Sequence, residues 1–186
     1  MHARHDIDTT FDFRSDANGK DPDSHSPTLR RYHRLLWSKP LPDGILFTLE
    51  DLGPKGYLRH RSERGEFLLS SDTVLRTFSN HKKMQHIISQ VPDVELEQAL
   101  HRGYTMGGMI LFPAVKIDGK QRINQARCTN RKIEDRFDLT LECIRRHYVG
   151  GASPLQHDLA LYVAFFSLFD NFRGYVDFFL LQDMVT

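Results

Sequence analysis

The stretch that decides the fold covers residues 109–148 and reads MILFPAVKIDGKQRINQARCTNRKIEDRFDLTLECIRRHY. Within its first third stands Asp118-Gly119, a dipeptide that tight type I′ turns favour. We therefore expect a β-hairpin that pairs Met109–Ile117 with Gln121–Ala126. Pro113 predicts a bulge or a sheet edge in the first of these strands, because proline lacks the N–H that a central strand donates.

A long amphipathic helix is expected directly after this hairpin, over Arg131–Tyr148. Apolar residues recur there every three to four positions, which places them on one face of a helix. These residues are Ile133, Phe137, Leu141, Ile144 and Tyr148. Gly150-Gly151 follows and ends the helix, since glycine readily adopts the left-handed conformation found after helix C-termini.

The chain before residue 109 predicts further short elements. Ser26-Pro27 is typical of a helix start, because serine caps the helix and proline suits its first position. Three short strands should follow, at Ile45–Leu49, Tyr57–Arg61 and Glu66–Leu69. Ser70-Ser71-Asp72 offers N-caps for a helix that runs through Ile88, and Val94–His101 predicts another helix.

The last third of the chain predicts two apolar helices, Leu155–Phe169 and Tyr175–Val185. Their many aromatic residues should form a core, and they could also cover a subunit interface. We therefore expect one α+β domain over residues 1–186, with a small, mostly antiparallel mixed sheet packed against helices and a helical C-terminal half. Residues 1–25 would be an acidic arm packed on, or tethered to, this body.

Composition excludes several classes of protein. The 25 Lys and Arg residues nearly balance the 24 Asp and Glu residues, which argues against a bulk binder of DNA or of anionic membranes. This balance conceals an acidic segment, since residues 1–26 carry a charge of −3 and the remainder +4. The longest apolar run is too short to span a bilayer, and no targeting signal is visible, so we expect a cytoplasmic protein.

Metal and cofactor motifs are not apparent in the sequence. The two cysteines cannot make a four-thiolate zinc site, and the ten histidines are scattered without carboxylates at ligand spacing. No Gly-rich phosphate loop, dinucleotide fingerprint, zinc-protease helix or nucleophile elbow occurs. We therefore expect no metal and no cofactor.

The strongest concentration of polar residues runs from Asn124 to Asp138, from the expected hairpin into the expected helix. Backbone N–H groups at a helix start attract anions, and arginine grips a phosphate in bidentate fashion. We interpret this junction as a phosphate site, in which Arg127 and Arg131 hold the phosphate and Asn124 orients the ligand.

Further residues would assist at the same junction. Arg136 adds positive charge, Asp135 or Asp138 holds the arginines or acts as a base, and His147 is an optional acid. The alternative is that these carboxylates pair with the arginines and leave an ordinary salt-bridged helix start.

Six longer motifs carry a family resemblance. They are DPDSHSPTLRRYH at residues 21–33, LWSKPLPDG at 36–44, GEFLLSSD at 65–72, INQAR at 123–127, DRFDLTLECIRRHY at 135–148 and GYVDFFLLQD at 174–183. The chain resembles, nearly end to end, a widespread bacterial family of uncharacterised soluble proteins with no assigned activity. The resemblance implies that the N-terminal segment is ordered on the body.

Two functional hypotheses follow. In the first, the protein binds or acts on a phosphate-bearing ligand, a nucleotide or RNA. The arm then completes the pocket with five residues, Asp23, Ser26, Tyr32, Trp37 and Lys39. Such a protein could serve in phage defence. In the second, it is a non-catalytic interaction module that forms a homo-oligomer or docks a partner through its C-terminal aromatic helices. Convergence of Asn124, Arg127 and the Asp21–Lys39 segment on one pocket would favour the first.

Overall fold

The computed structural model describes residues 7–52, 58–75, 85–115, 117, 119–120 and 122–185. The main sheet has four antiparallel strands in the order β3 (Glu50–Asp51), β4 (Leu58–Ser62), β5 (Gly65–Thr73) and β6 (Met109–Pro113). A second small sheet pairs β1 (Lys39–Pro40) with β2 (Leu46–Phe47). The α+β fold with a helical C-terminal half is therefore confirmed.

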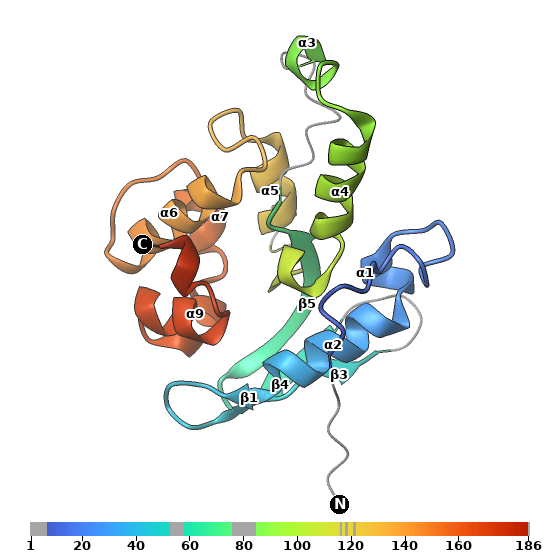
Figure 1. Cartoon of the computed structure of the whole chain (residues 1–186). Helices are drawn as coiled ribbons and strands as arrows, with labels where there is room; N and C mark the ends of the chain where they lie inside the picture. Colours follow the sequence, from blue (N-terminus) through green and yellow to red (C-terminus); the bar gives the residue numbers. More distant parts are fainter. Residues whose placement is uncertain are drawn as a thin grey trace, which may run out of the picture.

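Helices lie on opposite sides of the main sheet (Figure 1). On one side are α1 (Pro22–His25) and α2 (Pro27–Trp37), the latter capped by Ser26 as the sequence predicts, since Ser26 Oγ accepts the N–H of Leu29 at 3.0 Å. The other side carries the C-terminal helices, whose bounds are α5 (Ile123–Thr129), α6 (Phe137–Tyr148), α7 (Gln156–Ala160), α8 (Val163–Phe166), η4 (Ser167–Phe169), α9 (Phe172–Phe178) and η5 (Gln182–Met184).

A third group of helices projects away from the sheet in Figure 1. It consists of α3 (Gln85–Ile88) and α4 (Asp93–Gly103), and the short η3 (Met106–Gly108) leads from α4 into β6. The helix predicted over Val94–His101 is therefore confirmed, with one or two more residues at each end.

Two hydrophobic clusters hold these layers together. The larger lies among the sheet and the C-terminal helices and includes Phe112, Phe165 and Phe169. The smaller joins Phe13 of the N-terminal arm to Leu29, Tyr32 and Met106. Because Phe13 is wholly buried and its N–H donates to the carbonyl of Tyr104 at 3.0 Å, the described part of the arm is packed on the body.

The prediction of a second strand in the hairpin is wrong. The first strand exists but ends at Pro113, and the segment predicted as its partner forms α5 instead; Asp118 lies outside the described residues. The buried positions Ile123, Ala126 and Arg127 are spaced by three and four residues, which is the period of a helix rather than of a strand.

Two further boundaries also differ from the predictions. The helix expected over Arg131–Tyr148 begins only at Phe137, because Glu134 and Asp135 have φ values of +48° and +62°, which a right-handed helix does not accommodate. Ser70-Ser71-Asp72 does not cap a helix but continues β5, paired with β6. Much of the helix predicted after it falls on residues 76–84, outside the described ranges.

The two predicted C-terminal helices are broken into shorter ones. The first is divided at Leu161 and Tyr162, between α7 and α8, and η4 then ends at Phe169. The second is divided at Leu180, whose φ of +57° separates α9 from η5. The aromatic residues nevertheless form a core as predicted, since Phe165, Phe169, Tyr175 and Phe179 are all buried.

Candidate functional site

The site lies where strand β5 has one open edge. β6 pairs with residues 69–73 of β5, whereas the pairing with β4 on the other side ends at Leu69. The C=O of Leu68 accepts the N–H of Ala114, and the N–H of Val74 donates to the C=O of Gly108, so both groups point toward the β6 side. Because these groups alternate along an antiparallel strand, the N–H and C=O of Ser71 point to the edge that no described strand covers.

Two side chains from distant helices close this edge. The Ser71 N–H donates to Asp23 Oδ1 at 2.9 Å, and Ser71 Oγ donates to the same oxygen at 2.5 Å. Asn124 of α5 reaches the same edge: its Nδ2 donates to the Ser71 carbonyl and to Ser70 Oγ, both at 3.3 Å. Residues of α1 and of α5 therefore meet on the same two residues of β5.

Arg127 is wholly buried beside this edge, with 0% of its surface exposed. Its Nη1 donates to Asp72 Oδ2, its Nε donates to Thr140 Oγ1 at 2.9 Å, and its Nη2 donates to the carbonyl of Asp135 at 3.3 Å. The guanidinium carbon lies 5.3 Å and 5.7 Å from the centres of two aromatic rings, those of Phe112 and Phe137. The guanidinium is thus enclosed by protein groups.

Burial raises the pKa of Asp72 to about 6. The positive charge of Arg127 opposes this rise, while the nearby carboxylates of Asp135 and Asp23 add to it. The Thr73 N–H also donates to Asp72 Oδ1 at 2.9 Å. Asp72 therefore has one oxygen toward the buried arginine and the other toward the open edge of β5.

Burial also raises the pKa of Asp23 to about 6, against the opposing effect of the two hydrogen bonds from Ser71. Both of those hydrogen bonds use Oδ1. Among the described residues, none donates a hydrogen bond to Oδ2 of this carboxyl, although the nearby charge of Arg30 also lowers its pKa. Asp23 is therefore held in place by one oxygen while the other is available to a ligand.

A cavity of about 450 Å³ lies between the N-terminal arm and this end of the sheet; we call it the arm cavity. It is lined by residues of three segments, namely Arg14, Gly19, Lys20, Asp21, Pro22 and Asp23 of the arm and α1, Ser71, Asp72 and Thr73 of β5, and Tyr104 and Met109 near the start of β6. Asp23, Ser71 and Asp72 are partly buried, whereas Arg14 and Lys20 are exposed. The cavity thus combines carboxyl groups at its inner end with cations at its rim.

Arg14 is fixed at the rim by two contacts. Its Nε donates to Asp12 Oδ1 at 3.0 Å, and its guanidinium carbon lies 4.9 Å from the centre of the Tyr104 ring. The short Arg14–Asp12 hydrogen bonds lower the pKa of Asp12 to about 2. Asp12 in turn lies 3.0 Å from His101 Nδ1 of α4, so the rim is anchored to the body.

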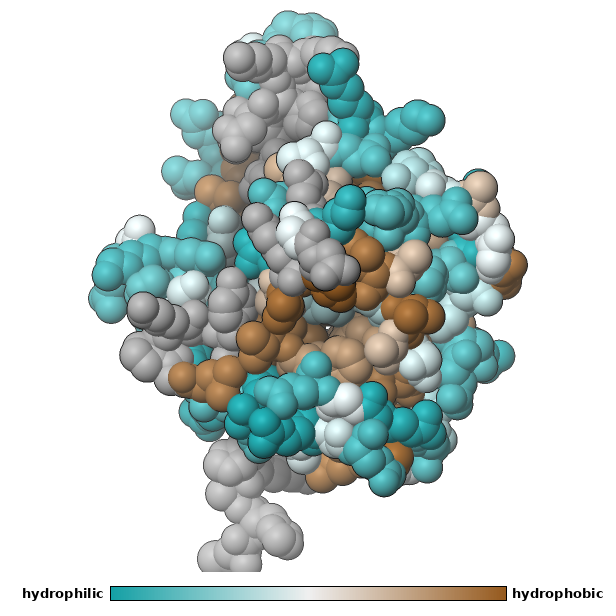
Figure 2. Space-filling view, turned by 180° about the vertical axis from the view of Figure 1, so that it is seen from behind, coloured by the Kyte–Doolittle hydropathy of each residue, from teal (hydrophilic) through white to brown (hydrophobic). Residues whose placement is uncertain are grey.

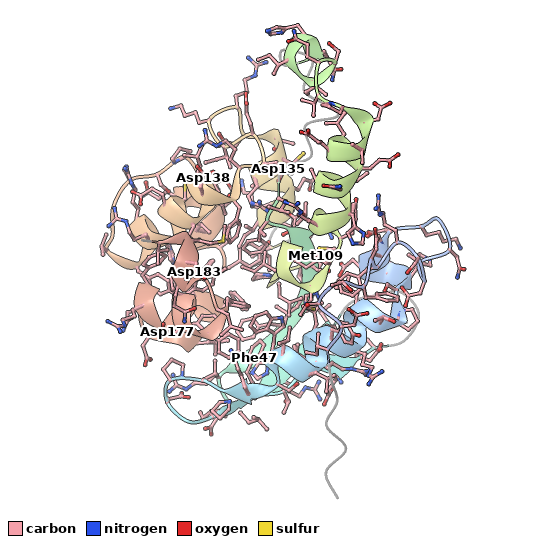
Figure 3. The ribbon with its side chains drawn as sticks, viewed as in Figure 1. Phe47, Met109, Asp135, Asp138, Asp177 and Asp183 are labelled. Carbon is pink, nitrogen blue, oxygen red and sulfur yellow. The ribbon has the colours of Figure 1, made fainter. Side chains whose placement is uncertain are left out.

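The other residues predicted for the helix start do not join this cavity. Arg136 pairs with Asp138 at 2.5 Å on the surface, and the side chain of Asp138 is 58% exposed. Arg131 is exposed, and Asp135 lies 3.6 Å from Arg127. Figure 3 shows Asp135 and Asp138 on the side of the C-terminal helices, away from Met109, which lines the arm cavity.

His147 lies near the end of α6 among aromatic rings, 5.2 Å from the ring of Phe166, and burial lowers its pKa. Of the residues predicted on the arm side, Tyr32 is buried and its hydroxyl accepts the N–H of Asp8 at 3.1 Å. Trp37 Nε1 donates to His33 at 3.0 Å, and Lys39 Nζ lies 4.7 Å from the centre of the Phe178 ring. None of these residues lines the arm cavity.

The sequence interpretation missed Arg14, Lys20, Ser71, Asp72 and Tyr104. Asp72 was considered only as a helix cap, although it directly follows the strand-forming segment Glu66–Leu69 and two serines. The two cations stand in the acidic arm, where a local count of charge hides them. Their convergence depends on contacts between residues far apart in the chain, which spacing does not reveal.

No metal-binding geometry is found in the described part of the chain, where no three His, Cys, Asp or Glu side chains gather suitably. Within the same residues, every helix is too short or too polar to cross a lipid bilayer. Neither a curated protein nor a solved structure matches the chain. One family model does match, over residues 7–186, and the chain therefore belongs to the family of unknown function DUF6994.

Proposed function

We propose that this protein binds or acts on a phosphate-bearing ligand, a free nucleotide or a nucleotide unit of RNA, in the arm cavity. One observation carries the proposal: a cavity of about 450 Å³ places exposed cations at its rim and partly buried hydrogen-bonding groups at its inner end. A volume in this range is typical of sites for small organic ligands. The proposal therefore moves the site from the start of α6 to the end of β5.

The rim supplies the groups that a phosphate needs. Arg14 is held by Asp12 and the Tyr104 ring, so little side-chain freedom is lost when it binds an anion. Its hydrogen bonds to Asp12 use Nε and Nη2, and Nη1 donates to no described residue, which leaves donors for a phosphate. Lys20 is exposed beside it and adds a second positive charge.

Arg127 and Asn124 support this site from behind. Because Arg127 is wholly buried, its role is to hold Asp72 in place rather than to contact the ligand. Asn124 fixes the backbone of Ser71 through its carbonyl. Both are positioning residues, and the Asp23 and Asp72 carboxyls, with pKa values raised to about 6, are suited to accept or release a proton near neutral pH.

The test is calorimetric titration of the full chain with nucleoside monophosphates and, separately, with short single-stranded RNA. Lys20→Ala should weaken binding by about 10-fold or more, the usual cost of losing a contact between charged groups. Lys120→Ala, which removes an exposed lysine outside the cavity, is the matched control and should leave binding unchanged.

The outcomes separate the possible ligands. Binding of free nucleotide that depends on Lys20 supports the proposal, and binding of RNA alone identifies RNA as the source of the phosphate. Absence of binding to either ligand would overturn the proposal. So would equal losses in the Lys20→Ala and Lys120→Ala variants.

The alternative function, an interaction module, has weaker support. The aromatic side chains of the C-terminal helices face the core, as the burial of Phe165 and Phe178 shows. Val163 and Leu180 are nevertheless 59% and 58% exposed. Figure 2 also shows hydrophobic surface on the face turned away from the view of Figure 1. Native mass spectrometry of the full chain tests this alternative together with bound nucleotide, because a dimer and a bound ligand change the mass differently.

A further inference from the structure

We infer that the arm cavity recognises the hydroxyl groups of a ribose at its inner end, through the carboxyls of Asp23 and Asp72, while the phosphate stays at the rim. This inference rests on the proposed function and specifies how the ligand lies. It predicts that ribose is preferred to 2-deoxyribose, a distinction that the rim cations alone cannot make.

The first step is the chemistry of the inner end, which is rich in acceptors and poor in donors. Asp23 Oδ2 accepts no hydrogen bond from a described residue, and each oxygen of Asp72 accepts one. Of the donors that line this end, the N–H and the hydroxyl of Ser71 both donate to Asp23. The guanidinium of Arg30, whose charge also acts on Asp23, donates to Asp51 and does not line the cavity. A ligand group that enters here must therefore bring donors of its own.

The second step is the position of the two carboxyls. Asp23 accepts the N–H of Ser71, which directly precedes Asp72, so the carboxyl groups lie within about 10 Å of each other. Both residues line the same cavity. The two carboxylates are also close enough for the charge of Asp23 to act on Asp72. In the inferred pose, neighbouring hydroxyls of one sugar would each donate to one of them, and carboxylate recognition of ribose hydroxyls is a recurrent way of binding nucleotides.

The third step is the orientation of the ligand. A phosphate offers only acceptors and negative charge near neutral pH, so it is repelled by the carboxyls at the inner end and attracted by Arg14 and Lys20 at the rim. Asp21 also stands at the rim, but its Oδ1 accepts the N–H of Asp23 and caps α1. The charge pattern thus favours one direction of entry, sugar first.

The experiment compares ribose 5-phosphate, 2-deoxyribose 5-phosphate and inorganic phosphate by calorimetric titration of the full chain. Loss of the 2-hydroxyl should weaken binding by about 10- to 100-fold, as expected when a hydrogen bond to a charged group is lost. Asp23→Asn should reduce this preference, since an amide is a weaker acceptor than a carboxylate but keeps an oxygen for Ser71. Circular dichroism and thermal unfolding check that the variant folds.

Asp177→Asn is the matched control, because Asp177 is exposed on α9 and lies far from Met109 in Figure 3. The control should keep the full preference for ribose. Equal affinity for the two sugar phosphates would overturn this inference while the proposed function stands. If neither sugar phosphate, nor inorganic phosphate, nor a nucleotide binds, both fail together.

Discussion

At the scale of the residue, Arg127 shows how a buried charge can serve a site that it does not touch. The guanidinium has no exposed surface and is bound by Asp72, Thr140 and the carbonyl of Asp135. A charge in such a place is stable only when its partners are complete. Its removal therefore affects Asp72 first and the arm cavity second.

We expect Arg127→Met to lower the free energy of unfolding by about 3–5 kcal/mol, because it leaves the Asp72 carboxylate without its buried partner. Urea unfolding followed by circular dichroism measures this change. Arg136→Met, which breaks the exposed pair with Asp138, should cost less than about 1 kcal/mol. A cost for Arg127→Met as small as that of Arg136→Met would show that the buried pair is not structurally important.

The order of the elements follows largely from sequence, but their boundaries do not. The apolar stripe from Phe137 to Tyr148 predicts α6 because its side chains pack on one face, and Ser26 predicts the start of α2 through its cap. The start of α6 and the end of α9 depend on single residues with positive φ, Asp135 and Leu180, for which side-chain periodicity has no signal.

The site itself was only partly predictable, for a related reason. Asn124, Arg127 and Asp23 were identified as polar residues of the site, and all three meet at β5. The local sequence could not show that Arg127 is buried, because its surroundings come from β5, β6 and α6 together. Sequence neighbours such as Arg131 and Asp138 turned out to be surface residues.

Among the elements, the end of α9 gives a direct test of backbone strain. Leu180 has a φ of +57° and its side chain is largely exposed, so a β-carbon is unfavourable there and few contacts compensate. Leu180→Gly should raise the free energy of unfolding by about 0.5–1 kcal/mol. Chemical denaturation measures it, with Val163→Gly, within α8, as a control that should be destabilising. Destabilisation by Leu180→Gly would contradict the assignment of strain.

At the scale of the whole molecule, Asp23 links the arm to the sheet in a pH-dependent way. Its pKa in the folded protein is about 6, against 3.8 for an ordinary aspartate. Between these values the folded protein binds a proton that the unfolded chain releases, so stability falls as the pH rises through this interval. The difference corresponds to about 3 kcal/mol at most.

We therefore expect Asp23→Asn to lose less stability than the unmodified protein between pH 4 and pH 6. Urea unfolding at several pH values measures the two slopes, and Asp177→Asn serves as the control. Asp72 has a similarly raised pKa and keeps part of the pH dependence in the variant. Parallel slopes for Asp23→Asn and the unmodified protein would show that Asp23 does not titrate in this interval.

The arm cavity is built by two parts of the chain that are almost fifty residues apart, since Asp23 and Ser71 are separated by 48 positions. A molecule bound between them would act as a removable cross-link and would hold the described part of the arm more firmly on the body. By thermodynamic reciprocity, whatever loosens the arm must also weaken the binding of the molecule. Occupancy of the cavity could then be measured by limited proteolysis, as protection of the arm against cleavage.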